Sequence, residues 1–310
     1  MKQWQRIFAV CAATAGLGFL VAATPALAAE PAKAALTGDA VCTRCHDEGD
    51  GNVLKLYQTK HGVRGDARTP GCQSCHGTSD GHLKAKKTLP DVVFGKNKSE
   101  ARAQDTACLT CHKSDKRTHW DGGQHQINDV SCSNCHSVHA STDKVRSKKT
   151  QAEVCFACHK DQRNDSRKIS HHPIGEGKVV CSSCHNPHGS AGPKLLAKNT
   201  VNETCYTCHA EKRGPFLWEH QPVTEDCSNC HNPHGSNISP LLKSRTPFLC
   251  SECHDGAHNS KVPYGTLTGG SQASPNSTVL PTENAGYRGC MNCHSMVHGS
   301  NHPAGALLHR

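Results

Sequence analysis

The sequence is organised around one pentapeptide, C-x-x-C-H, which occurs ten times along the 310 residues. Its two thiols lie one helical turn apart, so they can add across both vinyl groups of one haem, and the histidine then lies beneath the iron as its proximal ligand. The motif predicts ten covalently bound haem c groups. The thioether cysteines would be Cys42, Cys45, Cys72, Cys75, Cys108, Cys111, Cys132, Cys135, Cys155, Cys158, Cys181, Cys184, Cys205, Cys208, Cys227, Cys230, Cys250, Cys253, Cys290 and Cys293. The proximal ligands would be His46, His76, His112, His136, His159, His185, His209, His231, His254 and His294.

Two other uses of paired cysteines explain this pattern less well. Zinc ribbons built on C-x-x-C need a second ligand pair, but they need no histidine after every second cysteine. A thioredoxin-like redox pair occurs once in a domain of alternating strands and helices, and no such alternation is visible. All ten motifs carry the histidine, and they use twenty of the 21 cysteines, leaving Cys11.

The composition predicts a multihaem cytochrome c fold with little regular structure. Thirteen aromatic side chains are too few to build a conventional core for a chain of this length. The segments between motifs are rich in Gly, Pro, Asn, Ser and Lys and hold few helical periods. We expect mostly irregular loops with short α-helices around a core of haems, and no significant β-sheet.

The first 28 residues have the pattern of a secretory signal. Lys2 and Arg6 precede an apolar run over residues 7–23, and Ala26, Leu27 and Ala28 end the segment with small residues. We expect cleavage after Ala28, export to the periplasm and loss of Cys11. Beyond this segment no apolar run is long enough for a membrane helix.

The formal charge of +9 could suggest that the protein binds nucleic acid, but the charge of the bound haems removes this reason. Ten haems bring roughly −20 from their propionates against about +10 from ferric haem centres, which leaves a neutral to acidic protein. We therefore expect no nucleic-acid partner.

The motifs recur in pairs, which indicates a two-haem repeat within a decahaem domain over residues 29–310. The predicted repeats are residues 42–107, 108–154, 155–204, 205–249 and 250–310, and they also allow a division into two pentahaem halves.

Histidine is also the expected sixth, distal ligand, because fourteen histidines lie outside the motifs and methionine is scarce. One histidine after each motif gives the predicted distal set His61, His82, His125, His139, His172, His188, His220, His234, His258 and His298, with His302 as a substitute. For His119, His171 and His309 we expect surface roles.

The spacing C-H-x-x-H adds a prediction about neighbouring haems. His139, His188 and His234 each follow a proximal histidine by three residues, which is too short a distance to clamp both faces of one macrocycle. Each such segment should therefore bind two different haems and tie them together.

Several stretches resemble the periplasmic decahaem cytochromes of the MtrA/DmsE type, which are similar to paired NrfB-like pentahaem modules. They are CHNPHGS, which occurs twice, CHAEKRGPFLWEHQPVTEDC at 208–227 and CMNCHSMVHGSNHP at 290–303. The resemblance implies an elongated wire that conducts electrons across the outer membrane in metal reduction or iron oxidation.

The partners are likewise implied by this resemblance. They are an outer-membrane porin-like β-barrel, an extracellular multihaem cytochrome or reductase, and periplasmic or inner-membrane cytochromes that donate or accept electrons. One alternative is a soluble periplasmic electron shuttle or store. Another is a multihaem reductase, which would need a haem with an open distal position; the surplus of histidine disfavours it, so we expect an electron carrier without catalytic residues.

Overall fold

The computed structural model describes residues 36–254 and 290–309, apart from the single positions 48, 64, 67, 86 and 304. The chain divides into two units, Met1–Thr37 and Gly38–Arg310, and the account below concerns the second. The predicted signal segment lies outside the described residues. No helix in the described part of the chain is long and apolar enough to cross a membrane.

Short helices joined by loops make up the described residues, and the only β-structure among them is four isolated bridges. The expected fold class is confirmed. The α-helices are α1 (Ala40–Thr43), α2 (Cys72–His76), α3 (Asp80–Lys84), α4 (Ala101–Leu109), α5 (Gln124–Ile127), α6 (Gln151–Phe156), α7 (Lys160–Asp165), α8 (Cys181–Cys184), α9 (Val201–Tyr206), α10 (Gln221–Glu225) and α11 (Phe248–Ser251). The 3-10 helices are η1 (Val53–Gln58), η2 (Lys60–Gly62), η3 (Asp115–Arg117), η4 (Cys132–Asn134), η5 (Lys144–Arg146), η6 (Pro193–Leu195), η7 (Ala210–Lys212), η8 (Cys227–Asn229), η11 (Cys290–Asn292) and η12 (Gly305–Leu307).

The first cysteine of every motif lies in one of these helices. In nine motifs the backbone N–H of the histidine donates to the carbonyl of the first cysteine at 2.9–3.1 Å, and the tenth motif forms α2. This single helical turn places both thiols of a motif on one side, as thioether attachment to one haem requires.

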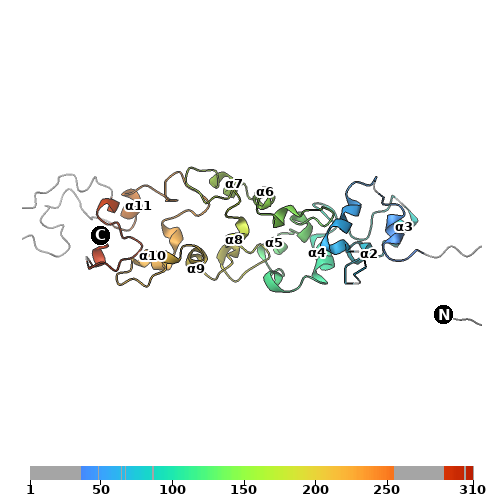
Figure 1. Ribbon diagram of the computed structural model, residues 1–310, viewed down its shortest axis with the longest axis horizontal. Coiled ribbons are helices and arrows are strands. Elements are labelled where there is room, and N and C mark those ends of the chain that lie inside the picture. Colours follow the sequence, from blue (N-terminus) through green and yellow to red (C-terminus); the bar gives the residue numbers. More distant parts are fainter. Residues whose placement is uncertain are drawn as a thin grey trace, which may run out of the picture. The chain divides into compact units, whose positions relative to one another are not determined.

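Within the unit Gly38–Arg310 the helices follow one another in chain order, from α2 and α3 through α6 and α8 to α10 and α11 (Figure 1). Some helices pack together across two intervening helices, such as α4 with η4 and α9 with η8. These pairs carry the two motifs of one predicted repeat.

Few apolar side chains are buried among the described residues. They are Trp120, Ala152, Phe156, Val180 and Leu308. So small an apolar set cannot form the conventional core of a domain of this length. Histidine rings and motif thiols lie where that core would be, which agrees with the shortage of aromatic residues in the sequence.

Candidate haem sites

The imidazole of each motif histidine lies opposite a second histidine. Ring centroids are separated by 5.9–6.3 Å in nine pairs and by 4.4 Å in the tenth. The pairs, motif histidine first, are His46 with His82, His76 with His139, His112 with His61, His136 with His188, His159 with His125, His185 with His234, His209 with His172, His231 with His298, His254 with His220, and His294 with His309.

The separation of 5.9–6.3 Å in nine of the pairs fits a metal between two imidazoles, whereas the 4.4 Å between His294 and His309 is shorter than a metal between the rings requires. A metal–imidazole bond is about 2 Å long and a ring centre lies about 1 Å beyond its ligating nitrogen, so two axial imidazoles have centroids about 6 Å apart. With two thiols beside one member of each pair, the donor set suits a haem that is bound covalently and ligated on both faces.

Nine of the ten predicted distal histidines lie opposite a motif histidine, and the tenth, His258, lies outside the described residues. His309 lies opposite His294, so the surface role expected for His309 does not fit its position. His302, the suggested substitute, is exposed, and its backbone N–H donates to Ser300 Oγ at 3.0 Å.

The two histidines of each C-H-x-x-H segment join different pairs. His136 lies opposite His188, whereas His139, three residues further on, lies opposite His76. The segments at His185 and His231 repeat the arrangement, because His188 and His234 each reach back to the motif two positions earlier. One short loop thus contributes to two candidate sites.

Most of these rings hold their Nδ1 in a hydrogen bond, which leaves Nε2 toward the partner ring. The acceptors are backbone carbonyls for His76 (Val92), His82 (Thr88), His125 (Pro187), His139 (Val53), His172 (Pro233), His185 (Lys194), His220 (Val297), His231 (Pro240) and His294 (Leu307), and carboxylates for His46 (Asp50) and His136 (Asp143). Such bonds fix the tautomer and orientation of a metal-binding histidine.

Burial also favours the neutral, ligating form of several rings. It lowers the pKa of His76, His112, His188, His234 and His298, because a charged imidazolium loses its hydration there. A neutral imidazole keeps the lone pair that binds a metal.

Comparison with known proteins points to the same chemistry. Residues 72–152 match the family model "Cytochrome c-type protein NrfB-like", and residues 171–214 and 220–259 match "Doubled CXXCH motif". The chain is 46% identical to the multiheme cytochrome MtrA of Shewanella baltica over 276 residues, which cover 87% of this chain and 80% of that protein. This chain belongs to the MtrA family of multihaem cytochromes.

More distant relatives agree with this assignment. The cytochrome c-type proteins NrfB of Escherichia coli and Haemophilus influenzae are each 28% identical, over 47% and 39% of this chain and over 80% and 65% of their own lengths. As a member of the MtrA family the chain binds haem c covalently through its C-x-x-C-H motifs, and it is an electron carrier rather than an enzyme.

In this MtrA-family chain the first thiols of the two motifs of a repeat lie together. Their mutual hydrogen bond raises the pKa of the Cys205 thiol and lowers that of Cys227, and Cys155 and Cys181 interact in the same way. In the first repeat, burial and then Asp39 raise the pKa of the Cys72 thiol to about 12, with a contribution from Cys42. Two attachment turns are therefore adjacent in each of these repeats.

Sequence analysis missed the residues that hold these turns together. Asp39, Asp105 and Asn202 each lie three residues before the first cysteine of a repeat, and each accepts the backbone N–H of the first cysteine of the next motif at 2.7–2.8 Å. A recurring Asp or Asn at this one offset was the available signal. We call these three residues the intra-repeat acceptors.

Successive repeats are joined at the H-G-S sequences that follow the second motifs. Ser236 pairs with Ser170 in an antiparallel bridge, and Ser300 pairs with Trp218, each with two backbone hydrogen bonds of 2.8–2.9 Å. The intervening glycine allows this approach: Gly235 has φ +147°, and a Cβ there would lie 1.9 Å from the carbonyl oxygen of Asp165.

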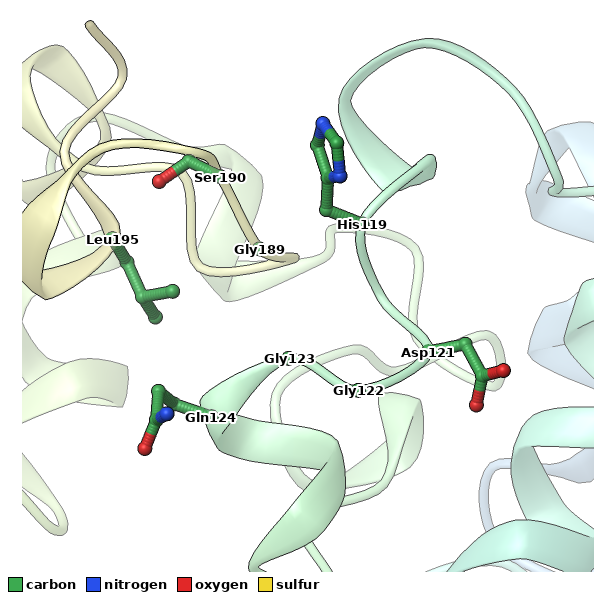
Figure 2. Close-up of a pocket in the computed structure, with 8 residues that line it drawn as sticks. All are labelled: His119, Asp121, Gly122, Gly123, Gln124, Gly189, Ser190 and Leu195. Atoms are coloured by element: carbon green, nitrogen blue, oxygen red, sulfur yellow. The ribbon is translucent and has the colours of Figure 1, made fainter. Parts of the chain in front are cut away.

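A small cavity replaces the bridge at the first H-G-S sequence. It has a volume of about 220 Å³, and its lining includes His119, Gln124, Ser190 and Leu195 (Figure 2). Gly123 and Gly189 also line it and lie close together, since a Cβ at Gly123 would be 3.7 Å from Gly189 Cα. Backbone still approaches closely here, since a Cβ at Gly189 would overlap the carbonyl of His119. The cavity lies between the segments that carry His125 and His188.

Proposed function

We propose that this cytochrome binds ten haems, that two histidines ligate each iron, and that the chain carries electrons along the haems across the outer membrane. The observation that carries the proposal is the set of ten histidine pairs described above, one for each motif. In this proposal His309, opposite His294 of the last motif, completes the distal set in place of His258.

Bound haem c would supply a one-electron Fe(III)/Fe(II) couple at each site. The paired histidines would fill both axial positions of each iron, so no coordination site would be open to a substrate. Histidine on both faces also favours lower potentials than a methionine–histidine pair. The repeats at residues 42–107, 108–154, 155–204, 205–249 and 250–310 are supported by the thiol contacts and intra-repeat acceptors.

The chain's distal histidines would keep neighbouring haems at fixed spacing. His125 Nδ1 donates to the carbonyl of Pro187, the residue before His188, and His172 is bonded in the same way to Pro233, the residue before His234. Each of these hydrogen bonds connects ligands of two sites. Beside His172, the Ser170–Ser236 bridge holds two successive repeats in one register. Electron transfer over short distances needs such a fixed spacing.

Residues 1–28 would direct export, and the mature protein would act from the periplasm. A loop-rich chain cannot face lipid, because each unpaired backbone group would cost several kcal/mol there. We infer that a porin-like β-barrel encloses it, with an extracellular multihaem cytochrome or reductase on one side and periplasmic or inner-membrane cytochromes on the other.

A liposome experiment tests the transmembrane role. Vesicles would hold the barrel that co-purifies with this cytochrome, the cytochrome itself and the external partner, with a redox dye inside and an impermeant electron donor outside. We expect the dye to be reduced only when the cytochrome is present. Equal reduction without it, or the absence of any co-purifying barrel, would instead support a soluble shuttle or store.

A further inference from the structure

We propose that four carboxylates in the first two repeats lower the reduction potentials of the haems bound there, so that electrons rest preferentially in later repeats. The carboxylates are Asp39, Asp50, Asp105 and Asp143. Each accepts a hydrogen bond from a haem-binding residue, whereas the corresponding acceptors in later repeats are neutral. This inference rests on the histidine ligation proposed above.

Asp143 gives the clearest case. Its Oδ2 lies 2.6 Å from His136 Nδ1, and its side chain is 19% exposed. A carboxylate at Nδ1 makes the imidazole a stronger electron donor through its other nitrogen. A stronger donor stabilises ferric over ferrous iron, and hydrogen bonding to the axial ligand is one way in which a protein sets haem potential.

The same position in later repeats is neutral. His185, His231 and His294 are, like His136, the proximal histidines of second motifs, and their Nδ1 atoms donate to the backbone carbonyls of Lys194, Pro240 and Leu307. The chain therefore contains its own comparison. Among the five second-motif sites, the one at His136 has the carboxylate, because His76 in the first repeat also donates to a backbone carbonyl, that of Val92.

The distal histidines of three of these sites also interact with cations: His188 with Arg117 and Lys116, His234 with Lys194, and His298 with Lys212. The second cation at His188 does not remove the difference, because Asp143 is hydrogen-bonded directly to the ring of His136. The carboxylates near the two later sites should have a smaller electrostatic effect on the haem than Asp143 has. Asp165 is paired with Lys168 at 2.6 Å, and Glu211 is 61% exposed and therefore screened by water.

First motifs show the same contrast. His46 Nδ1 lies 2.5 Å from Asp50 Oδ2 in the first repeat. In the fourth repeat the nearest equivalent, Glu211, lies 3.8 Å from His209 Nδ1, which is beyond hydrogen-bond distance. Because Asp50 is 47% exposed, its effect on potential should be smaller than that of Asp143.

The intra-repeat acceptors add one buried carboxylate, Asp105, and one partly exposed carboxylate, Asp39, to the first two repeats. Asp105 is 3% exposed and accepts from the backbone N–H of Cys132 and from Trp120 Nε1. Asp39 likewise accepts from Cys72 N–H and from the Tyr57 hydroxyl. In the fourth repeat the neutral Asn202 has this position. A negative charge shielded from water beside the attachment site favours the more positive, ferric state of the haem.

The test is the Asp143→Asn substitution in the full holoprotein. The amide oxygen can still accept the histidine N–H, so the change removes charge and keeps the hydrogen bond. The matched control is Asp129→Asn, an exposed aspartate seven residues before His136, as Asp143 is seven after it. We expect Asp143→Asn to move one haem of ten to higher potential in a spectroelectrochemical titration, and the control to overlay the wild type.

Paramagnetic NMR locates the haem. The resonances that move in Asp143→Asn belong to the site at His136, and in the wild type they should be among the last to lose their ferric character on stepwise reduction. An unchanged titration, an equal shift in the control, or early reduction of those resonances would overturn the inference. Asp50→Asn, on an exposed segment, provides a second variant if Asp143→Asn fails to fold.

The haem count and the low-spin spectrum separate this inference from the proposed function. Both are measured on every variant. If they match ten histidine-ligated haems while the potentials do not move, the inference about the carboxylates fails and the proposed function stands. If the wild type itself lacks those properties, the proposed function fails first.

Discussion

His188 lies opposite His136 with ring centroids 6.0 Å apart, although 52 residues separate them in sequence. His188 belongs to the segment whose first histidine, His185, faces His234. A distal ligand is thus provided by the motif segment that follows two motifs later. This interlocking makes each segment responsible for two sites, and several measurable consequences follow from it.

Replacing His188 should disturb two haems. In His188→Ala the iron at His136 would lose its distal ligand and become high-spin. The site at His159 would shift less, because Pro187, next to His188, accepts the hydrogen bond from the distal His125. EPR and redox titration measure both effects. His171→Ala is the control, since His171 Nδ1 donates to the carbonyl of Lys168, three residues earlier in the same loop. An effect confined to one haem would contradict the interlocked arrangement.

His309 should matter more than His302. The ring of His309 lies 4.4 Å from that of His294, so His309→Ala should expose one iron. After reduction, this variant should bind one carbon monoxide per protein. His302→Ala, seven residues away, should bind none. The reverse result would restore His302 as the distal ligand of the last motif.

The glycine of the second H-G-S sequence should resist substitution. In Gly235→Ala, strain at positive φ and overlap with the Asp165 carbonyl should cost about 2–4 kcal/mol. The midpoint of denaturant unfolding, followed by the Soret band, should fall accordingly. Gly175→Ala is the control, because a Cβ there meets nothing within 4 Å. Equal midpoints for the two variants would show that the close approach is not required.

The buried carboxylate of Asp105 should stabilise the second repeat. Asp105→Ala would leave the Cys132 N–H and Trp120 Nε1–H without their acceptor, at a cost of about 2–5 kcal/mol. The unfolding midpoint measures this loss, and the exposed Asp129→Asn should change it little, since asparagine tolerates the φ of +56° at that position. A stable Asp105→Ala variant would mean that the two attachment turns are held by the haems alone.

The sequence predicted the fold class because the repeated motif and the shortage of aromatic residues are both visible without a structure. It also selected His61, His82 and most other histidines that lie in pairs, since one histidine recurs after nearly every motif. It could not supply the pairing, because His188 and His136 are 52 residues apart in sequence and come together only in the folded chain. His309 was passed over because His298 already filled the last place in the sequence order, and Asp105 because a polar residue outside the motif has no distinctive chemistry until its acceptor role is visible.

Carbon monoxide binding to the reduced wild-type protein, together with its haem count, tests the central claim most directly. The purified mature protein should contain ten covalently bound haems and no alkylatable thiol in intact-mass analysis. Its ferric EPR spectrum should be low-spin throughout, and the reduced protein should bind no carbon monoxide. Fewer haems, a substantial high-spin signal or one carbon monoxide bound per protein would contradict the ten histidine-ligated sites.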